Sequence, residues 1–482
     1  MTSPRFKLRH MAAPTVLLVA LAGCASVTPQ ENLTSSQEAI GPLFSGTEAP
    51  SVQLAQTDET RTQFTQEANA LLQKPLSQAD AMRLALVNSP AFQSLIAASW
   101  RDASEAANSG RIPNPIFSFE RMAIGDEREI TRTLSFGVMD LLLWPLRNQQ
   151  ADQRIEQTRL KLAGDMIEHL TNVRTAWVAA VAATEQLNYA QMLMKNGELT
   201  AELARRMKEA GNFNRLDHLR QQSFYADAAT NLAQAQAREA QTRETLTRSL
   251  GLDASQRENL QLPTRLPDLP DFPVLEATVL ASVSDQRLDI RLARATWLAN
   301  ASASQRAAFD SYIDVELGLK NTNISDRASG ESIRGKGFEA DVSLPLFNWG
   351  GAARDAAEAD ALSAKYSLEQ VIRDAASDAR QSYMSYRTAY DLARHYRDEI
   401  IPLQQAIAEE NVLRYNGMLI GVFELLANHR EQTSTVMAAI TQQENFWMAD
   451  ARLQASMLGR PVMGELKPSQ TSKSNNAGDG GH

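Results

Sequence analysis

Residues 205–219 read RRMKEAGNFNRLDHL, a turn marked by Gly211 between two very long helical patterns. A related stretch, RYNGMLIGVFELL at 414–426, places Gly417 between two further long patterns. Glycine readily ends a helix because it tolerates the backbone conformations that reverse the chain. The same order of elements surrounds both stretches. The chain therefore reads as one unit used twice, with Gly211 and Gly417 marking the tips of two helix pairs.

Each copy of this unit has the order helix, β-hairpin, very long helix, glycine turn and long helix. The first repeat spans 76–250 and the second spans 276–460, with a proline-rich linker at 251–275. Trp100 and Trp297 occupy equivalent places in the first helix of each repeat. We expect a mainly α-helical fold with a smaller β part and an internal two-fold repeat.

Helices of unusual length dominate both repeats. Pro145, which suits a first helical position, opens a pattern of about 65 residues, on the order of 95 Å long. A matching pattern covers 350–416, where Pro402 is expected to bend the helix. The returning helices are expected at 215–250 and 422–458. The helix at 215–250 keeps a strict heptad seam of mostly small residues, which indicates coiled-coil packing.

The first helix of each repeat is shorter. In the first repeat it is expected at 76–110, with Ser77 as its N-cap and Asp80 three residues on, as in a capping box. In the second repeat it is expected at 275–309.

Four segments alternate between apolar and polar residues, as half-buried β-strands do. They lie at 114–120, 130–138, 312–320 and 338–344, with a polar loop at 321–336. Arg132 interrupts the apolar face of the second segment. The polar faces carry acids at Glu120, Asp314, Glu316, Glu339 and Asp341. Apolar residues toward lipid and polar residues toward a lumen are the pattern of transmembrane β-strands.

Four strands are too few to close a barrel, and lipid does not tolerate open sheet edges. Several chains must then share one barrel: two chains would supply eight strands and three would supply twelve. The alternative is a soluble sheet packed against helices, which leaves the length of the helices without an explanation.

The N-terminus carries a secretion signal, expected at 1–23, with a basic start and a short apolar run. Small residues precede Cys24, as at a bacterial lipoprotein cleavage site, so Cys24 is expected to be the lipidated N-terminus. It is the sole cysteine, so an intrachain disulfide is impossible. Residues 24–75 are expected to form an extended tether, and 461–482 a disordered tail. No later segment has the roughly twenty apolar residues of a transmembrane helix.

Composition and motifs argue against several functions. The net charge of −9 is spread along the chain, so we expect no nucleic-acid partner. The sequence has no phosphate-binding glycine loop, nucleophile elbow or His/Cys metal spacing, so we expect no enzyme, cofactor or metal site. His218 and His429 lie just past the two tips, and whether they contact a metal is left open.

The Cys24 lipobox, the duplicated pattern, the two glycine tips and the sequence PLFNWGG at 345–351 together resemble the TolC family of outer-membrane efflux proteins. The resemblance covers roughly 76–460. It implies a homotrimer in the outer membrane of a Gram-negative bacterium, with a twelve-stranded barrel in lipid and an α-helical barrel in the periplasm. It also implies two partners, a periplasmic adaptor (membrane fusion protein) and an inner-membrane transporter.

In this family the helix tips close a periplasmic aperture through polar and acidic contacts. Asp217 follows Gly211 at the family's spacing, so the resemblance assigns it a role at the aperture. The second tip departs from the pattern. Glu424 lies at the acidic position only when counted from Tyr415, which is one residue nearer the glycine than the usual tyrosine. Either these residues close the aperture, or an apolar cluster closes it or binds the adaptor: Met418, Leu419 and Ile420.

Two functions follow from these features. The first is an outer-membrane exit duct of a tripartite efflux or secretion system. The second is a periplasmic, lipid-tethered coiled-coil adaptor or scaffold without a pore. The cargo of a duct, whether drug, metal or protein, is not named by the sequence. The stretch Val422–Leu426 is similar to the metal-efflux branches of the family, which makes heavy-metal efflux one candidate.

Overall fold

The computed structural model divides the chain into two compact units and describes a defined set of residues. The described residues are 28–44, 51–284, 286–310, 314–326, 328–343, 347 and 349–460. The first unit comprises Met1–Ser35, Ile96–Lys161 and Leu292–Leu368; the second comprises Ser36–Leu95, Leu162–Arg291 and Glu369–His482. Cys24, the signal at 1–23 and the tail at 461–482 lie outside the described residues, as do Pro345, Leu346 and Asn348 of the PLFNWGG stretch.

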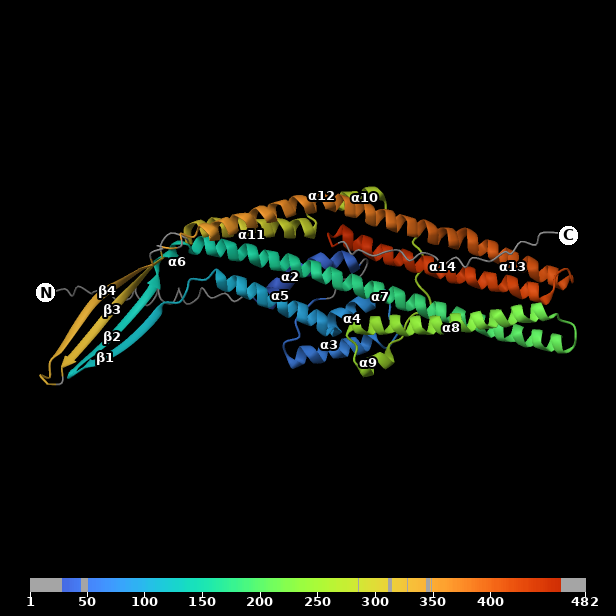
Figure 1. Ribbon diagram of the computed structural model, residues 1–482, viewed down its shortest axis with the longest axis horizontal. Coiled ribbons are helices and arrows are strands. Elements are labelled where there is room, and N and C mark those ends of the chain that lie inside the picture. The colour runs from blue at the N-terminus through green and yellow to red at the C-terminus, as the bar shows by residue number, and fades with distance from the viewer. Residues whose placement is uncertain are drawn as a thin grey trace, which may run out of the picture. The chain divides into compact units, whose positions relative to one another are not determined.

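The first unit contains one antiparallel sheet in the order β1-β2-β3-β4 (Figure 1). Its strands are β1 (Ile116–Ile124), β2 (Glu127–Gly137), β3 (Asp314–Asp326) and β4 (Ser332–Ser343). The central pair, β2 and β3, joins the two sequence repeats, with Leu134 opposite Leu319. All four predicted strands are therefore present and pair in chain order.

The strands of the second hairpin are longer than predicted. We expected a polar loop at 321–336, but β3 continues to Asp326 and β4 begins at Ser332. The apolar alternation fades after Lys320, so the side chains give no strand signal there. The backbone is nonetheless paired on both sides, for example with Asn321 opposite both Arg132 and Lys336. Pairing by neighbouring strands overrides weak local preference in a sheet.

Helices account for most of the described residues, and each repeat contains long ones, as expected. The first repeat has α6 (Val138–Leu142), α7 (Trp144–Glu209) and α8 (Arg215–Leu250). The second has α12 (Gly351–His395), the π-helical turn η2 (Tyr396–Ile400), α13 (Ile401–Asn416) and α14 (Val422–Met457). Within the described residues, no helix combines the length and apolar character that crossing a membrane requires.

The irregular turn η2 lies directly before Pro402, the residue expected to bend this helix. Proline has no N–H and its ring crowds the carbonyl one turn earlier. The helix accommodates this with a π turn, in which one extra residue widens the spiral. In the first repeat, α7 continues over 66 residues as an α-helix.

The helix predicted at 76–110 is divided into α4 (Gln78–Asn88) and α5 (Pro90–Ser109). Ser89 precedes a proline and is held in an extended conformation, which ends α4. The predicted N-cap is confirmed, because the Ser77 hydroxyl accepts a hydrogen bond from the Asp80 amide at 3.1 Å. The helix predicted at 275–309 is likewise divided, into α10 (Glu276–Ser282) and α11 (Leu288–Asp310).

The expectation that 24–75 is an extended tether is wrong for much of its described part. This part contains α2 (Pro29–Ile40), η1 (Gly41–Phe44) and α3 (Asp58–Leu71). Leu33 and Ile40, one heptad apart, are fully buried. Most of the residues around them are polar, with several Ser, Thr and Gln. The composition of this segment therefore did not predict a helix. The linker at 251–275 similarly contains the short helix α9 (Ala254–Asn259).

The second unit has an apolar core built from both repeats. Trp177 of α7 is 2% exposed, and its indole N–H donates to the Leu76 carbonyl at 2.8 Å. Around α14, Tyr386, Tyr390 and Phe446 form a buried aromatic cluster, with Tyr386 and Phe446 ring centres 5.5 Å apart. Gly251 ends α8 in the left-handed conformation, where an added Cβ would lie 2.7 Å from the Ser89 Cα.

A buried ion pair connects α7 to α14 within this unit. Arg174 Nη2 donates to Asp450 Oδ2 at 2.5 Å, and both side chains are under 10% exposed. Arg174 Nη1 also donates to Gln454 Oε1 at 2.6 Å, and the Gln454 amide donates back to Asp450 at 3.0 Å. Burial raises the pKa of Asp450, while Arg174 opposes that rise. Each partner is thus needed to hold the other's charge inside the protein.

Replacing Arg174 by Leu should destabilise the protein by about 3–5 kcal/mol, because Asp450 would remain buried without a cation. The double variant R174L/D450L should recover most of that loss, since two apolar groups would replace both charges. Chemical denaturation followed by circular dichroism would measure both. Arg373→Leu, which removes an exposed pair with Glu369, is the matched control and should cost less than about 1 kcal/mol. A double variant as unstable as R174L would contradict this account.

Candidate functional site

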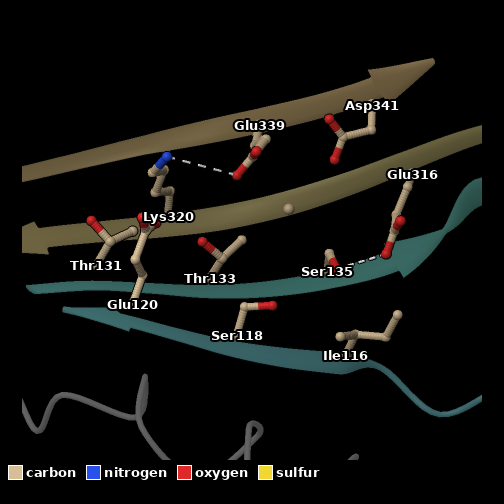
Figure 2. Close-up of a pocket in the computed structure, with 11 residues that line it drawn as sticks. Ile116, Ser118, Glu120, Thr131, Thr133, Ser135, Glu316, Lys320, Glu339 and Asp341 are labelled. Atoms are coloured by element: carbon tan, nitrogen blue, oxygen red, sulfur yellow. Dashed lines mark hydrogen bonds and ion pairs between the residues drawn. The ribbon is translucent and has the colours of Figure 1, made fainter. Parts of the chain in front are cut away.

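One face of the four-stranded sheet is polar and hollowed. Side chains of every second residue point from the strands into a cavity of about 370 Å³ (Figure 2). The lining residues are Ile116, Ser118, Glu120, Thr131, Thr133, Ser135, Glu316, Gly318, Lys320, Glu339 and Asp341. The predicted acids Glu120, Glu316, Glu339 and Asp341 are thus brought together on one surface. Asp314 pairs in register with Ser343 at the end of the same sheet.

The charges of this polar face are mostly negative. Four carboxylates line the cavity, and its one cation is Lys320. Lys320 Nζ lies 3.9 Å from Glu339 Oε2, and the Ser135 hydroxyl donates to Glu316 Oε1 at 2.7 Å (Figure 2). Charged and hydroxyl groups at this density favour a surface in contact with water or a passing solute.

The opposite face of the sheet is apolar over the part nearest the helices. One row crosses all four strands, with Phe117, Leu134, Leu319 and Phe338 in register. Each of these side chains is exposed, and Phe338 reaches 83%. A contiguous row of large exposed apolar side chains is typical of a surface that contacts another protein or a membrane. The sheet therefore separates a polar surface from an apolar one.

Arg132, which interrupts the predicted apolar alternation, does not disturb the register. It lies on the same face as Phe119, its partner across the strands, with the guanidinium 6.0 Å from the ring centre. Arginine can cover an aromatic face while its charged end stays in a polar environment. The alternation is preserved.

The first helix tip has the geometry expected around Gly211. Gly211 adopts φ +77°, and its amide donates to the Lys208 carbonyl at 3.0 Å. The next amide, Asn212, donates to the Met207 carbonyl at 2.9 Å, which completes a Schellman motif. Asn214 then caps α8 by accepting from the Asp217 amide at 2.8 Å.

The Asp217 carboxylate, assigned to the aperture by resemblance, has partners within its own chain. It accepts a hydrogen bond from the Asn214 side chain and lies 3.3 Å from Arg220 Nη1. Its side chain is about a third exposed. The carboxylate is thus held at the start of α8, where negative charge is favourable, while part of it stays accessible.

The second tip repeats this geometry with a different residue at the left-handed position. The Met418 amide donates to the Tyr415 carbonyl at 2.9 Å, and the Leu419 amide donates to the Arg414 carbonyl at 2.8 Å. Met418 has φ 57°, whereas Gly417 has φ −78°. Met418, not Gly417, is therefore the structural counterpart of Gly211. The usual preference for glycine at this position predicted Gly417, the residue before Met418. Counting back four residues from the start of the following helix, at 215 and at 422, would have identified Gly211 and Met418 as equivalent.

The predicted apolar cluster of the second tip is divided by the turn. Met418 and Leu419 are 93% and 72% exposed, while Ile420 is 8% exposed. Tyr415 is 40% exposed, and Glu424 also faces solvent. A large apolar side chain in a left-handed conformation costs free energy, and here that side chain is also exposed to solvent.

An aromatic contact joins the two tips. The rings of Phe213 and Phe423 stack with centres 4.5 Å apart. Farther along, Arg430 lies 4.1 Å above the Phe224 ring, and burial lowers the pKa of Arg430. Sequence reasoning did not find these contacts, although Phe213 and Phe423 lie two and six residues from the tip glycines.

The two histidines near the tips are in different environments. His218 is 7% exposed, whereas His429 is exposed and pairs with Gln432 at 3.2 Å. Among the described residues, no group of three or more His, Cys, Asp or Glu side chains is arranged to hold a metal ion.

Comparison with known proteins supports this picture. The family model described as "Outer membrane efflux protein" matches residues 126–252 and 280–411, which is more than half of the chain. The two matched segments correspond to the two repeats. No curated protein matches the chain significantly.

Several solved structures share the fold. The CmeC outer membrane channel of Campylobacter jejuni is 12% identical, with 87% of this chain and 91% of that chain covered and a TM-score of 0.63. The outer membrane protein VceC of Vibrio cholerae is 14% identical, with 79% and 96% covered and a TM-score of 0.64. CusC, described with transmembrane channel formation, is 16% identical, with 86% and 96% covered and a TM-score of 0.63. At these identities the likeness establishes the fold.

The left-handed position of the second tip can be tested by stability. Met418→Gly should stabilise the protein by roughly 0.5–1 kcal/mol, because glycine adopts this conformation without the side-chain penalty. Gly211→Ala should destabilise it by about 1 kcal/mol for the converse reason. Gly417→Ala is the control and should be close to neutral, since its φ suits any residue. Thermal unfolding of the purified variants would measure all three. A cost at Gly417 with no gain at Met418 would show that the turn is placed one residue earlier.

Proposed function

Because the chain belongs to the outer membrane efflux protein family, we propose that it is the outer-membrane exit duct of a tripartite efflux or secretion system. The observation that carries this proposal is the two-faced sheet. Its acid-rich hollow suits a water-filled lumen, and its row of exposed apolar side chains suits lipid. In this role the protein conducts cargo and catalyses no reaction.

The membrane part of the duct is proposed to be a barrel shared by three chains. In the described sheet, β1 and β4 each pair on one side. Lipid offers no hydrogen-bond partners to the remaining edges, so strands of other copies must cover them. Three copies supply twelve strands, enough for an open lumen. The twelve-stranded homotrimer is therefore the assembly we propose.

The proposed location is the outer membrane of a Gram-negative bacterium, with the long helices in the periplasm. Cys24 would carry the lipid anchor after removal of the signal at 1–23. A lipid chain adds membrane affinity to that of the barrel. Mass spectrometry of the mature N-terminus would identify the modification on Cys24.

The proposed partners are a periplasmic adaptor and an inner-membrane transporter, which would select the cargo and supply the energy. The exposed side chains of Met418 and Leu419 offer an apolar surface for the adaptor at the second tip. Heavy-metal ions are one candidate cargo, supported by the sequence of Val422–Leu426. Export assays in a deletion strain, comparing copper, silver, zinc and several drugs, would identify the cargo.

Purified protein should form discrete conductance steps in planar lipid bilayers. Because carboxylates line the sheet's hollow, the current should favour cations. The variant E316Q/E339Q should keep the step frequency and lose part of the cation preference, measured as a smaller reversal potential in a salt gradient. If the folded trimer shows no conductance, the proposal of an exit duct is wrong. That result would favour the adaptor or scaffold without a pore.

The gate is proposed to lie at the helix tips, with two candidate mechanisms. In the first, Asp217, with Tyr415 and Glu424 of the second tip, forms polar contacts between chains. In the second, exposed Met418 and Leu419 close the aperture by excluding water. The in-chain contacts of Asp217 leave part of its carboxylate accessible for the first mechanism.

Asp217→Ala should raise the single-channel conductance if acidic contacts hold the aperture closed. Asp217→Asn keeps the size of the side chain and removes its charge, so it separates the loss of charge from the loss of volume. Unchanged conductance in both variants would assign the gate to Met418 and Leu419. In that event Met418→Ser should open the channel instead.

A further inference from the structure

The outward face of the sheet, opposite the acid-lined hollow, changes character along the strands. Nearest the helices it is apolar, as in the row from Phe117 to Phe338. Toward the hairpin turns it becomes basic. Five cations make up this basic band: Arg121, Arg128, Arg132, Arg334 and Lys336.

The strand register places these cations on one face. Arg132 is in register with Phe119, Asn321 and Lys336, and the Arg132–Phe119 contact confirms that their side chains share a side. The next row joins Arg121 to Arg334 through the central strands. The alternation of side chains puts all five opposite the residues of the hollow.

The two faces of the sheet segregate charge by sign. The hollow has four acids and one lysine. On the outward face of the four described strands, every charged residue is a cation and none is Asp or Glu. Four members of the band are exposed, and Arg128 is half-buried. The four exposed cations, Arg121, Arg132, Arg334 and Lys336, therefore share this face with no Asp or Glu of the described strands, and an external anion would complement them.

The band lies at the turn end of the sheet. β1 and β2 meet at the turn Gly125–Asp126, while α6 follows the opposite end of β2. The rows of Phe117 and Arg121 are four residues apart, roughly 13 Å along the strand. The midplane of a hydrocarbon core about 30 Å thick lies about 15 Å from the headgroups on either side, which is a comparable distance. With the apolar rows in hydrocarbon, the band would be at headgroup depth.

We propose that the basic band binds the phosphate groups of anionic lipid headgroups in the leaflet nearest the hairpin turns. This inference rests on the proposed membrane-spanning role of the sheet. Guanidinium groups bind phosphate oxygens in a bidentate manner, and the band has three exposed ones in adjacent rows: Arg121, Arg132 and Arg334. Clusters of cations beside a membrane recognise anionic lipids in this way. The site selects lipid surrounding the duct and is separate from the conducting surface.

The test is lipid binding by the full-length protein. Purified wild type and the variant R121Q/R132Q/K336Q would be titrated with bisphosphorylated lipid A in detergent micelles that contain phosphatidylcholine. Native mass spectrometry would count the bound lipid. Each lost cation weakens binding to an anionic surface about fivefold, so the triple variant should bind on the order of a hundredfold more weakly. Binding of phosphatidylcholine alone should be equal in both.

The control variant R61Q/R257Q/R373Q removes the same charge from exposed helix positions and should bind like wild type. Equal loss in this control would overturn the proposal, because net charge alone would account for binding. Displacement of the lipid by an equimolar amount of inorganic phosphate would also overturn it, by assigning the band to free anions.

Conductance separates failure of this inference from failure of the proposed function. The triple variant should still form conducting channels, since its substitutions are outside the hollow. If wild type and the triple variant both conduct and bind lipid A equally, the lipid site is refuted and the duct stands. If wild type fails to conduct, both the duct and the lipid site fall.

Discussion

Backbone alternation in a β-strand is the constraint on which the sheet's properties depend. Successive side chains point to opposite faces, so a shift of one residue would exchange the two surfaces. The register that pairs Leu134 with Leu319 therefore fixes the acid-lined hollow, the apolar rows and the basic band together. It also explains why Arg132 is tolerated among apolar neighbours, since it lies in the row where the outward face becomes polar.

Much of the fold was predictable because long periodic patterns are strong signals. The four strands, the long helices and the Ser77 cap followed from residue spacing. The extension of β3 through Asn321 did not, because its strand conformation comes from pairing with β2 and β4 rather than from its own side chains. The helices near Leu33 were not predicted for a similar reason. Their few apolar residues are buried by segments that lie elsewhere in the sequence, so the local pattern does not show their burial.

The types of residue at the candidate site could be predicted from the sequence better than their positions in space. The acids of the hollow were found from alternation, and the comparisons establish the family and the fold. At the tips, residue type misled: glycine preference pointed to Gly417, whereas the backbone places Met418 at the left-handed position. The Phe213–Phe423 contact joins residues far apart in the sequence, and no local pattern encodes such a pairing.

The π turn before Pro402 has a consequence for the symmetry of the two repeats. One extra residue within a helix rotates all following side chains by about 100° relative to those before it. The unbroken α7 has no such phase shift. Residues at equal distances from the starts of α7 and α12 therefore fall on different faces of the helix once the π turn is passed. The duplication preserves the order of elements while the proline makes its two copies rotationally distinct.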